Sequence, residues 1–145
     1  MIAIDTNLLI YSHRGDSEFH EPAVEVLDSL RHQAGPWAIP WPCIHEFIAI
    51  ATHTGIFRPA STLAQAFGFI DSLFAAPQLE VLAEGPGYLE RLRVISSAAR
   101  LSGPRIHDAR IAALCLHHGV SELWSADRDF SAFPQIKVRN PLVRK

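Results

Sequence analysis

The chain has 145 residues, a net charge of −2 at pH 7 and a hydrophobic fraction of 48%, which together predict one globular domain spanning residues 1–145. Thirteen basic residues against fifteen acidic ones exclude a strongly basic protein that grips nucleic acid through many phosphate contacts, but they allow a nuclease whose acids are offset by metal. No signal peptide, long apolar run or CxxC pair occurs, so we expect a cytoplasmic protein without a membrane segment, in which Cys43 and Cys115 are reduced.

The chain begins with a very short apolar run that stops at a carboxylate. Residues 2–4 are too few for a helix and include two isoleucines, which predicts a buried central strand. Asp5 follows directly, and ligands of open parallel sheets bind outside the carboxyl ends of the strands. Thr6 and Asn7 add a hydroxyl and an amide beside it. Asp is also a common helix N-cap, so capping a helix at residues 6–11 is the alternative role of Asp5.

The following segment continues the alternation of helices and strands. A polar turn at residues 12–17 precedes a helix that ends near Gln33, and residues 37–39 form a second predicted strand. The next helix, residues 42–54, carries Glu46 near the border of its apolar face. That position suits either a partly desolvated functional carboxylate or an ordinary solvated charge.

The helix expected at residues 62–75 is more apolar than a surface helix requires. At 100° per residue its apolar side chains cover an arc of roughly 160°. These residues are Leu63, Ala66, Phe67, Phe69, Ile70, Leu73 and Phe74. A second copy or a partner protein that covers the arc is one interpretation, and a thick internal layer is the other. Beyond this helix, a third strand is expected at residues 79–82 and a helix at residues 87–100.

The last forty residues place further acids at the ends of elements. Asp108 lies in the first turn of a helix predicted at residues 107–116, where an acid also complements the helix dipole. A fourth strand, residues 120–125, is followed at once by Asp127 and Asp129. Two predicted strands therefore end at an acid.

The alternation of elements predicts an α/β fold with a central, mainly parallel sheet of four to five strands. Residues 136–138 supply the optional fifth strand, and residues 139–145 form a basic tail. Right-handed βαβ units gather strand ends and helix starts at one rim of such a sheet. We expect four carboxylates to converge there: Asp5, Glu46, Asp108 and Asp127.

Crowded carboxylates raise one another's pKa values unless a cation neutralises them. Their oxygen ligands suit Mg²⁺ or Mn²⁺, and the lack of Cys or His at zinc spacing argues against Zn²⁺. The eight histidines match no ligand template. Arg14, Arg110 and Arg128 are candidates for contacts with phosphate, with a solvated helix face as the alternative for each.

The order and spacing of these motifs resemble those of PIN-domain ribonucleases, and specifically of VapC toxins from VapBC toxin–antitoxin systems. The matching segments are Asp5-Thr6-Asn7, Glu46, Asp108-Ala109, residues 125–130 and Asn140-Pro141-Leu142. Ser125 stands where the family usually has Thr, and it keeps the hydroxyl. The resemblance implies a PIN-like α/β/α sandwich and a Mg²⁺-dependent endoribonuclease that acts on structured RNA. It also implies a homodimer that a small cognate VapB-like antitoxin inhibits.

The predicted mechanism is metal-assisted phosphodiester hydrolysis, with Asp5 as the principal ligand and Glu46, Asp108 and Asp127 completing the site directly or through water. The expected supporting residues, which orient ligands or water, are Thr6, Asn7, Ser125 and Asp129. Asp129 is expected either to cap a short turn or to support the ligands from behind, while Phe130 anchors that segment in the core.

Two other classes of protein fit parts of the pattern. A haloacid-dehalogenase-like phosphatase also begins with an Asp after its first strand, but it needs a second Asp where this chain has Asn7, and Lys137 and Lys145 are poorly placed for its lysine. A non-catalytic RNA-binding module would tolerate the loss of the four acids, all of which are present.

Overall fold

The computed structural model describes residues 1–143, which form a five-stranded sheet with helices on both sides. The strands are β1 (Ile2–Ile4), β2 (Trp37–Pro40), β3 (Leu79–Leu82), β4 (Glu122–Trp124) and β5 (Val138–Arg139). Their order across the sheet is β3-β2-β1-β4-β5, and every neighbouring pair is parallel. The predicted α/β class with a parallel central sheet is therefore confirmed.

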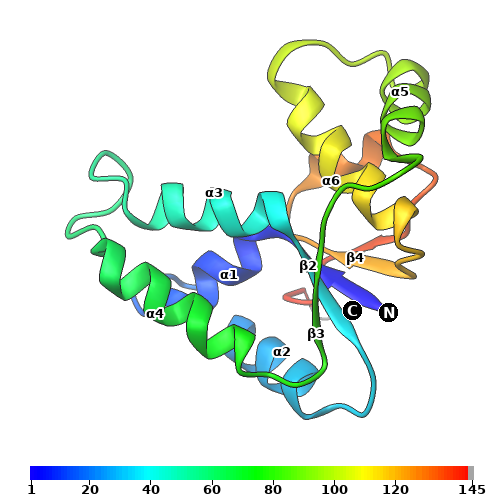
Figure 1. The fold of residues 1–145 in the computed structure, drawn as a ribbon. Helices are drawn as coiled ribbons and strands as arrows, with labels where there is room; N and C mark the ends of the chain where they lie inside the picture. Colours follow the sequence, from blue (N-terminus) through cyan, green and yellow to red (C-terminus); the bar gives the residue numbers. More distant parts are fainter. Residues whose placement is uncertain (144–145) are drawn as a thin grey trace.

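The helices occupy the segments between the strands, as right-handed crossovers require. They are α1 (Thr6–His13), α2 (His20–His32), α3 (Trp41–Ala51), α4 (Leu63–Phe74), α5 (Tyr88–Ala98) and α6 (Ile106–His117), with short 3₁₀ helices η1 (Gly103–Arg105) and η2 (Arg128–Ala132). Helices α1 and α2 lie to one side of the sheet and α5 and α6 to the other (Figure 1). Within residues 1–143, none of these helices is long and apolar enough to cross a membrane.

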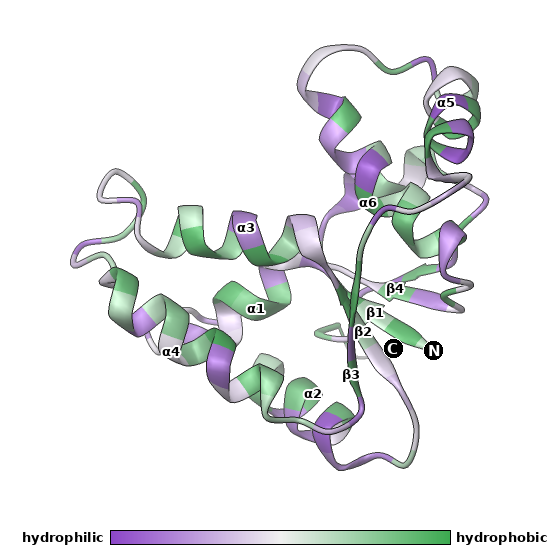
Figure 2. Cartoon of the chain, in the orientation of Figure 1, coloured by the Kyte–Doolittle hydropathy of each residue, from purple (hydrophilic) through white to green (hydrophobic). Residues whose placement is uncertain are grey.

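The core is built on the two central strands and on α1. Ala3, Ile4 and the β2 residues Trp37, Ala38 and Ile39 are all fully buried. A strand covered on both faces has no side that needs polar residues, which explains the uninterrupted apolar runs. Figure 2 shows that β1 is hydrophobic along its length, and in α1 the hydrophobic residues are Leu8, Leu9 and Ile10. The C-terminal end of β1, where Asp5 stands, is consequently fixed at the centre of the sheet.

Several predicted boundaries differ from the structure, among them those of the fourth strand, which spans Glu122–Trp124 and not residues 120–125. Helix α1 continues to His13 instead of ending at residue 11, and α3 ends at Ala51, so Gly55 does not close it. Strand β5 begins at Val138 because Ile136 is held in a turn, where its N–H donates to the carbonyl of Phe133 at 3.2 Å. Arg139 therefore belongs to the sheet and not to the basic tail, whose last residues, 144–145, lie outside the described residues.

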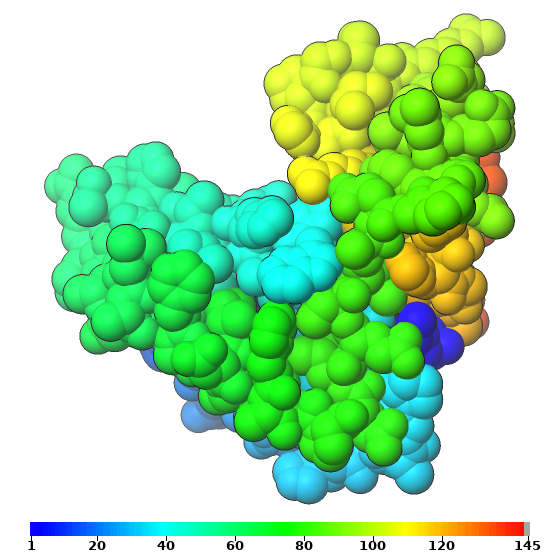
Figure 3. All heavy atoms as spheres, in the orientation of Figure 1, coloured from blue at the N-terminus to red at the C-terminus, as the bar shows by residue number. Residues whose placement is uncertain are grey.

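The broad apolar arc of α4 is divided between the interior and the surface. Ala66, Ile70 and Leu73 are buried, whereas Leu63 and Phe67 are 60% and 50% exposed. Figure 3 shows α4 on the surface of the molecule, between α2 and α3. A thick internal layer therefore accounts for only part of the arc, and the predicted partner surface is reduced to the exposed residues Leu63, Phe67 and Phe74.

Candidate active site

Asp5 stands where β1 ends and α1 begins, so it caps the helix and also lies at the rim of the sheet. Its side chain accepts a hydrogen bond from the Thr6 N–H at 2.8 Å and caps α1. The same carboxylate lies at the carboxyl end of the central strand and is only 5% exposed. Capping thus orients the carboxylate at the rim without removing it from the crevice where ligands bind.

A network of side chains from distant parts of the chain holds this carboxylate. The Ser125 hydroxyl donates to Asp5 Oδ2 at 2.7 Å, and the Cys43 thiol donates to Asp5 Oδ1 at 3.5 Å. Asn7 Nδ2 donates to Ser125 Oγ at 3.3 Å, and Asn7 Oδ1 accepts from the Ala126 N–H at 3.3 Å. The donors restrict Asp5 to one rotamer, so the predicted orienting roles of Asn7 and Ser125 have a geometric basis.

Burial raises the pKa of Asp5 despite its hydrogen bonds. Desolvation is the largest cause and favours the protonated form, while the bonds from Ser125, Thr6 and Cys43 oppose it. The carboxylate of Asp127 adds a small upward contribution. A buried acid with these surroundings is stabilised in its charged form when a cation approaches.

Glu46 and Asp108, which lie on two different helices, also have raised pKa values. Partial desolvation raises the pKa of Glu46 on α3, and the nearby carboxylates of Asp5 and Asp108 raise it further. Desolvation also raises the pKa of Asp108 in the first turn of α6, followed by the carboxylates of Asp127 and Asp129. Arg105 offsets part of this repulsion at 3.9 Å from Asp108. The acids interact electrostatically, as the predicted convergence at one rim requires.

Asp127, and not Asp129, caps the turn that follows β4. Its Oδ1 accepts from the Asp129 N–H at 2.8 Å, and its own N–H donates to Ser125 Oγ at 2.9 Å. Of the two roles open to Asp129, capping this turn is wrong, because an Asp side chain bonds the backbone two residues further on and therefore acts from the first position of the turn, which is Asp127. Phe130 is 1% exposed, so its predicted role as an anchor is confirmed.

The side chains suit a hard divalent ion that keeps part of its water shell. Within residues 1–143, no three His, Cys, Asp or Glu side chains approach closely enough to form a ready-made metal cage. The donors at the rim are nevertheless carboxylate oxygens, and the buried Thr6 hydroxyl is close enough to Glu46 to lower the pKa of that carboxylate. Mg²⁺ is bound through one or two carboxylates and several waters, so an open set of acids fits this ion.

The three candidate arginines lie in different environments. Arg14 is at the far end of α1, where it pairs with Asp16 at 2.7 Å and lies over the Phe57 ring at 4.3 Å. Eight helical residues, each rising about 1.5 Å, separate it from the rim, so the structure does not bring it to the acids. Arg110 ion-pairs with Glu84 at 3.4 Å and lines a hollow beside Glu46, and Arg128 is exposed at the start of η2.

Sequence reasoning missed Cys43 and two histidines. Cys43 precedes Glu46 by one helical turn, a spacing that places both on the side of α3 facing Asp5. His45 and His107 line, with Glu46 and Arg110, a hollow of about 330 Å³ between α3 and α6. Figure 3 shows the notch between the cyan residues of α3 and the yellow residues at the start of α6. No metal-ligand spacing marked these histidines in the sequence.

Comparison with known proteins agrees with this geometry. The family model for the PIN domain matches residues 2–136, and the chain belongs to this family. Nucleases of the family generally use divalent metals. Because the PIN domain model covers nearly the whole chain, this match favours the nuclease prediction over the haloacid-dehalogenase alternative.

Within this family, the chain is similar to several individual proteins and solved structures. The chain is 34% identical to ribonuclease VapC31 of Mycobacterium tuberculosis over 98% of this chain and 100% of that protein. It is 31% identical to VapC ribonuclease Mb2897 of Mycobacterium bovis, over 98% and 96% of the two chains. Its fold is similar to that of the M. tuberculosis toxin VapC20, which cleaves the sarcin–ricin loop, with a TM-score of 0.69 at 14% identity over 94% and 99% of the two chains. A VapBC2 structure from Rickettsia felis, bound to promoter DNA, gives a TM-score of 0.70 at 14% identity over 96% and 98%.

Proposed function

We propose that this protein is a Mg²⁺-dependent endoribonuclease and the toxin component of a type II toxin–antitoxin system, acting on structured RNA. One observation carries the proposal: a buried carboxylate, Asp5, is fixed by three donors at a sheet rim that it shares with three other acids. The similarity to VapC ribonucleases over nearly the whole chain supports the assignment.

The proposed roles of the residues follow from their positions. Asp5 is the principal ligand, and Glu46, Asp108 and Asp127 hold the ion directly or through water. Bound Mg²⁺, or Mn²⁺ in its place, lowers the pKa of a water and stabilises charge on the attacking and leaving oxygens. Ser125 and Asn7 keep Asp5 oriented, and the Thr6 N–H donates a hydrogen bond to the Asp5 carboxylate. We expect Asp129 to orient the ligands without binding the ion itself.

The proposed contacts with RNA use the basic residues that border the acids. Arg110, beside Glu46, and Arg128, beside Asp127, are placed to contact phosphates on the two sides of the rim. Arg14, predicted as a third contact, is engaged by Asp16 and the carbonyl of Pro59, so we propose it only for a distal part of a long substrate.

The proposed partners are a small VapB-like antitoxin and a second copy of this chain. Solved structures with this fold include VapBC complexes, which supports an antitoxin as the partner. The exposed side chains of Leu63, Phe67 and Phe74 support an apolar contact on α4 between copies. A cytoplasmic location is consistent with such a role.

Incubation of the purified protein with total RNA tests the proposal. Cleavage should appear with Mg²⁺, stop with EDTA and return when excess Mg²⁺ is added. Asp5→Asn should remove the activity, whereas Asp71→Asn, which changes an exposed acid on α4, should not. RNA binding without any cleavage would favour the non-catalytic module, and cleavage that ignores EDTA would falsify the metal mechanism.

A further inference from the structure

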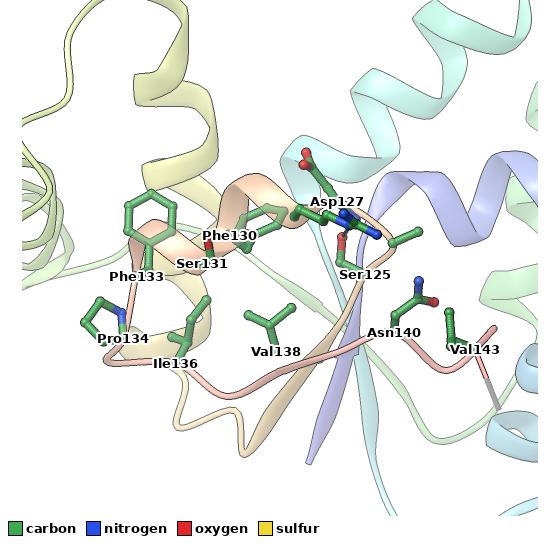
Figure 4. A pocket seen from close by; sticks show the side chains of 12 residues that line it. Ser125, Asp127, Phe130, Ser131, Phe133, Pro134, Ile136, Val138, Asn140 and Val143 are labelled. Carbon is green, nitrogen blue, oxygen red and sulfur yellow. Dashed lines mark hydrogen bonds between the residues drawn. The ribbon is translucent and has the colours of Figure 1, made fainter. Parts of the chain in front are cut away.

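A second hollow adjoins the acidic rim on the side away from Glu46. Because β1 lies between β2 and β4, Glu46 after β2 and Asp127 after β4 flank Asp5 from opposite directions. The hollow beside Asp127 has a volume of about 690 Å³ and lies between η2 and the β5 segment (Figure 4). The residues that matter for its chemistry are Asp127, Arg128, Ile136, Val138, Asn140 and Val143.

The walls of this hollow are mainly apolar, with one oriented amide. Figure 4 shows Ile136, Val138 and Asn140 pointing from the β5 segment toward η2. Asn140 Oδ1 accepts from the Leu142 N–H at 3.0 Å, which fixes the amide, and within residues 1–143 its Nδ2 group has no acceptor. The smaller hollow at Glu46 differs, since its lining includes His45, His107 and Arg110.

The mouth of the apolar hollow carries charge of both signs. Arg128 is exposed there, and Asp127 joins the hollow to the other acids. The Asp127 backbone is fixed by its bond to Ser125, so the hollow and the carboxylate of Asp5 have a defined relative position. An RNA strand whose phosphate reaches the acids therefore has a cation and an apolar recess next to that phosphate.

We infer that the hollow between η2 and β5 receives the base of an unpaired nucleotide adjoining the phosphate that is cleaved. This inference rests on the proposed ribonuclease function. An unstacked base has apolar faces and polar edges, which match the aliphatic walls and the Asn140 amide. Arg128 neutralises the neighbouring phosphate, and the volume exceeds what one base occupies.

Substitutions that fill the hollow or remove its polar amide test the inference. Val138→Trp should fill it and slow RNA cleavage roughly tenfold, because the base loses its contacts. Asn140→Ala should change the base preference beside the cut, as seen by sequencing RNA ends, with a smaller effect on rate. Val94→Trp, an equal change at an exposed position on α5, should leave rate and cut sites as in the wild type.

Binding separates this inference from the proposed function. In EDTA, wild-type protein should bind a short single-stranded RNA more tightly than the same RNA with abasic positions, measured by fluorescence anisotropy. Val138→Trp should lose this difference while keeping a native circular dichroism spectrum. Base-dependent binding of RNA by a wild type that does not cleave it would overturn the proposed function and still support binding of a base in the hollow. Wild-type cut sites and base-dependent binding in both Val138→Trp and Asn140→Ala would overturn the inference alone.

Discussion

The two carboxylate oxygens of Asp5 accept hydrogen bonds that stabilise the fold, and the same oxygens are the proposed metal ligands. One accepts from the Thr6 N–H and the Cys43 thiol, and the other accepts from the Ser125 hydroxyl. A ligand carboxylate held in this way needs no rearrangement when an ion binds, although its burial is unfavourable until the ion arrives.

The two acids after β4 should differ in their effect on cleavage. Asp127→Ala should abolish RNA cleavage, whereas Asp129→Ala should reduce it about 10–100-fold, the usual effect of an outer partner. Asp127→Ala also removes the cap of η2, at a typical loss of about 1 kcal/mol. Asp127→Asn keeps an oxygen for the cap and should still lack activity. The reverse ranking of Asp127 and Asp129 would contradict the assignment.

The Cys43 thiol should act on metal binding through Asp5. Cys43→Val removes the donor with little change in volume and should raise the Mg²⁺ concentration for half-maximal cleavage about fivefold. Cys43→Ser keeps a donor and should restore most of the affinity. Cys115→Val, at the other buried thiol, is the control. Equal Mg²⁺ dependence in Cys43→Val and Cys115→Val would show that the contact has no such role.

The raised pKa values predict how metal-free protein responds to pH. Because Glu46 and Asp108 have folded pKa values above 4.5 and 3.8, the fold gains stability when they are protonated and loses it as pH rises through the raised values. In EDTA, the Tm advantage of Glu46→Gln or Asp108→Asn over wild type should therefore grow from pH 4 toward neutrality. Glu90→Gln, an exposed acid on α5, should show no such trend, and Mg²⁺ should reduce the advantage of the first two variants.

At the scale of single elements, the exposed apolar residues of α4 predict that copies of the chain associate through this helix. Phe67→Lys places a charge in the exposed apolar stripe and should convert an oligomer into a monomer, measured by light scattering at micromolar concentration. Ser72→Lys, at an exposed polar position of the same helix, should leave the oligomer intact. A wild-type monomer without antitoxin would refute the role of α4.

The order of elements was predictable because hydrophobic period and turn residues are local properties. β5 was misplaced because it has only two residues, and its register depends on pairing Leu123 with Val138 across the chain. The four acids could be proposed from the sequence because a parallel sheet dictates where strand ends gather. The contact of Cys43 with Asp5 and the withdrawal of Arg14 to Asp16 depend on packing between helices, which no local pattern encodes.

At the scale of the whole molecule, the sheet order explains why the site lies between two unlike hollows. The central strand β1 supplies Asp5, and its two neighbours lead to α3 on one side and η2 on the other. The lining of the hollow on the α3 side includes two histidines and an arginine, and the hollow on the η2 side has mainly apolar walls that include Phe130 and Phe133. A strand of RNA crossing the rim therefore meets different chemistry before and after the acids.

The bond from Ser125 to Asp5 joins residues 120 positions apart, so the first and last parts of the chain must meet before the principal carboxylate is oriented. During synthesis on the ribosome, Asp5 emerges long before β4 and the Ser125 hydroxyl that follows it. A chain truncated after Gly119 should be inactive on total RNA, and adding a peptide of residues 120–145 should restore some cleavage. Activity in the truncated chain alone would refute this dependence. A nascent chain therefore holds its principal carboxylate without the Ser125 donor until β4 has been made.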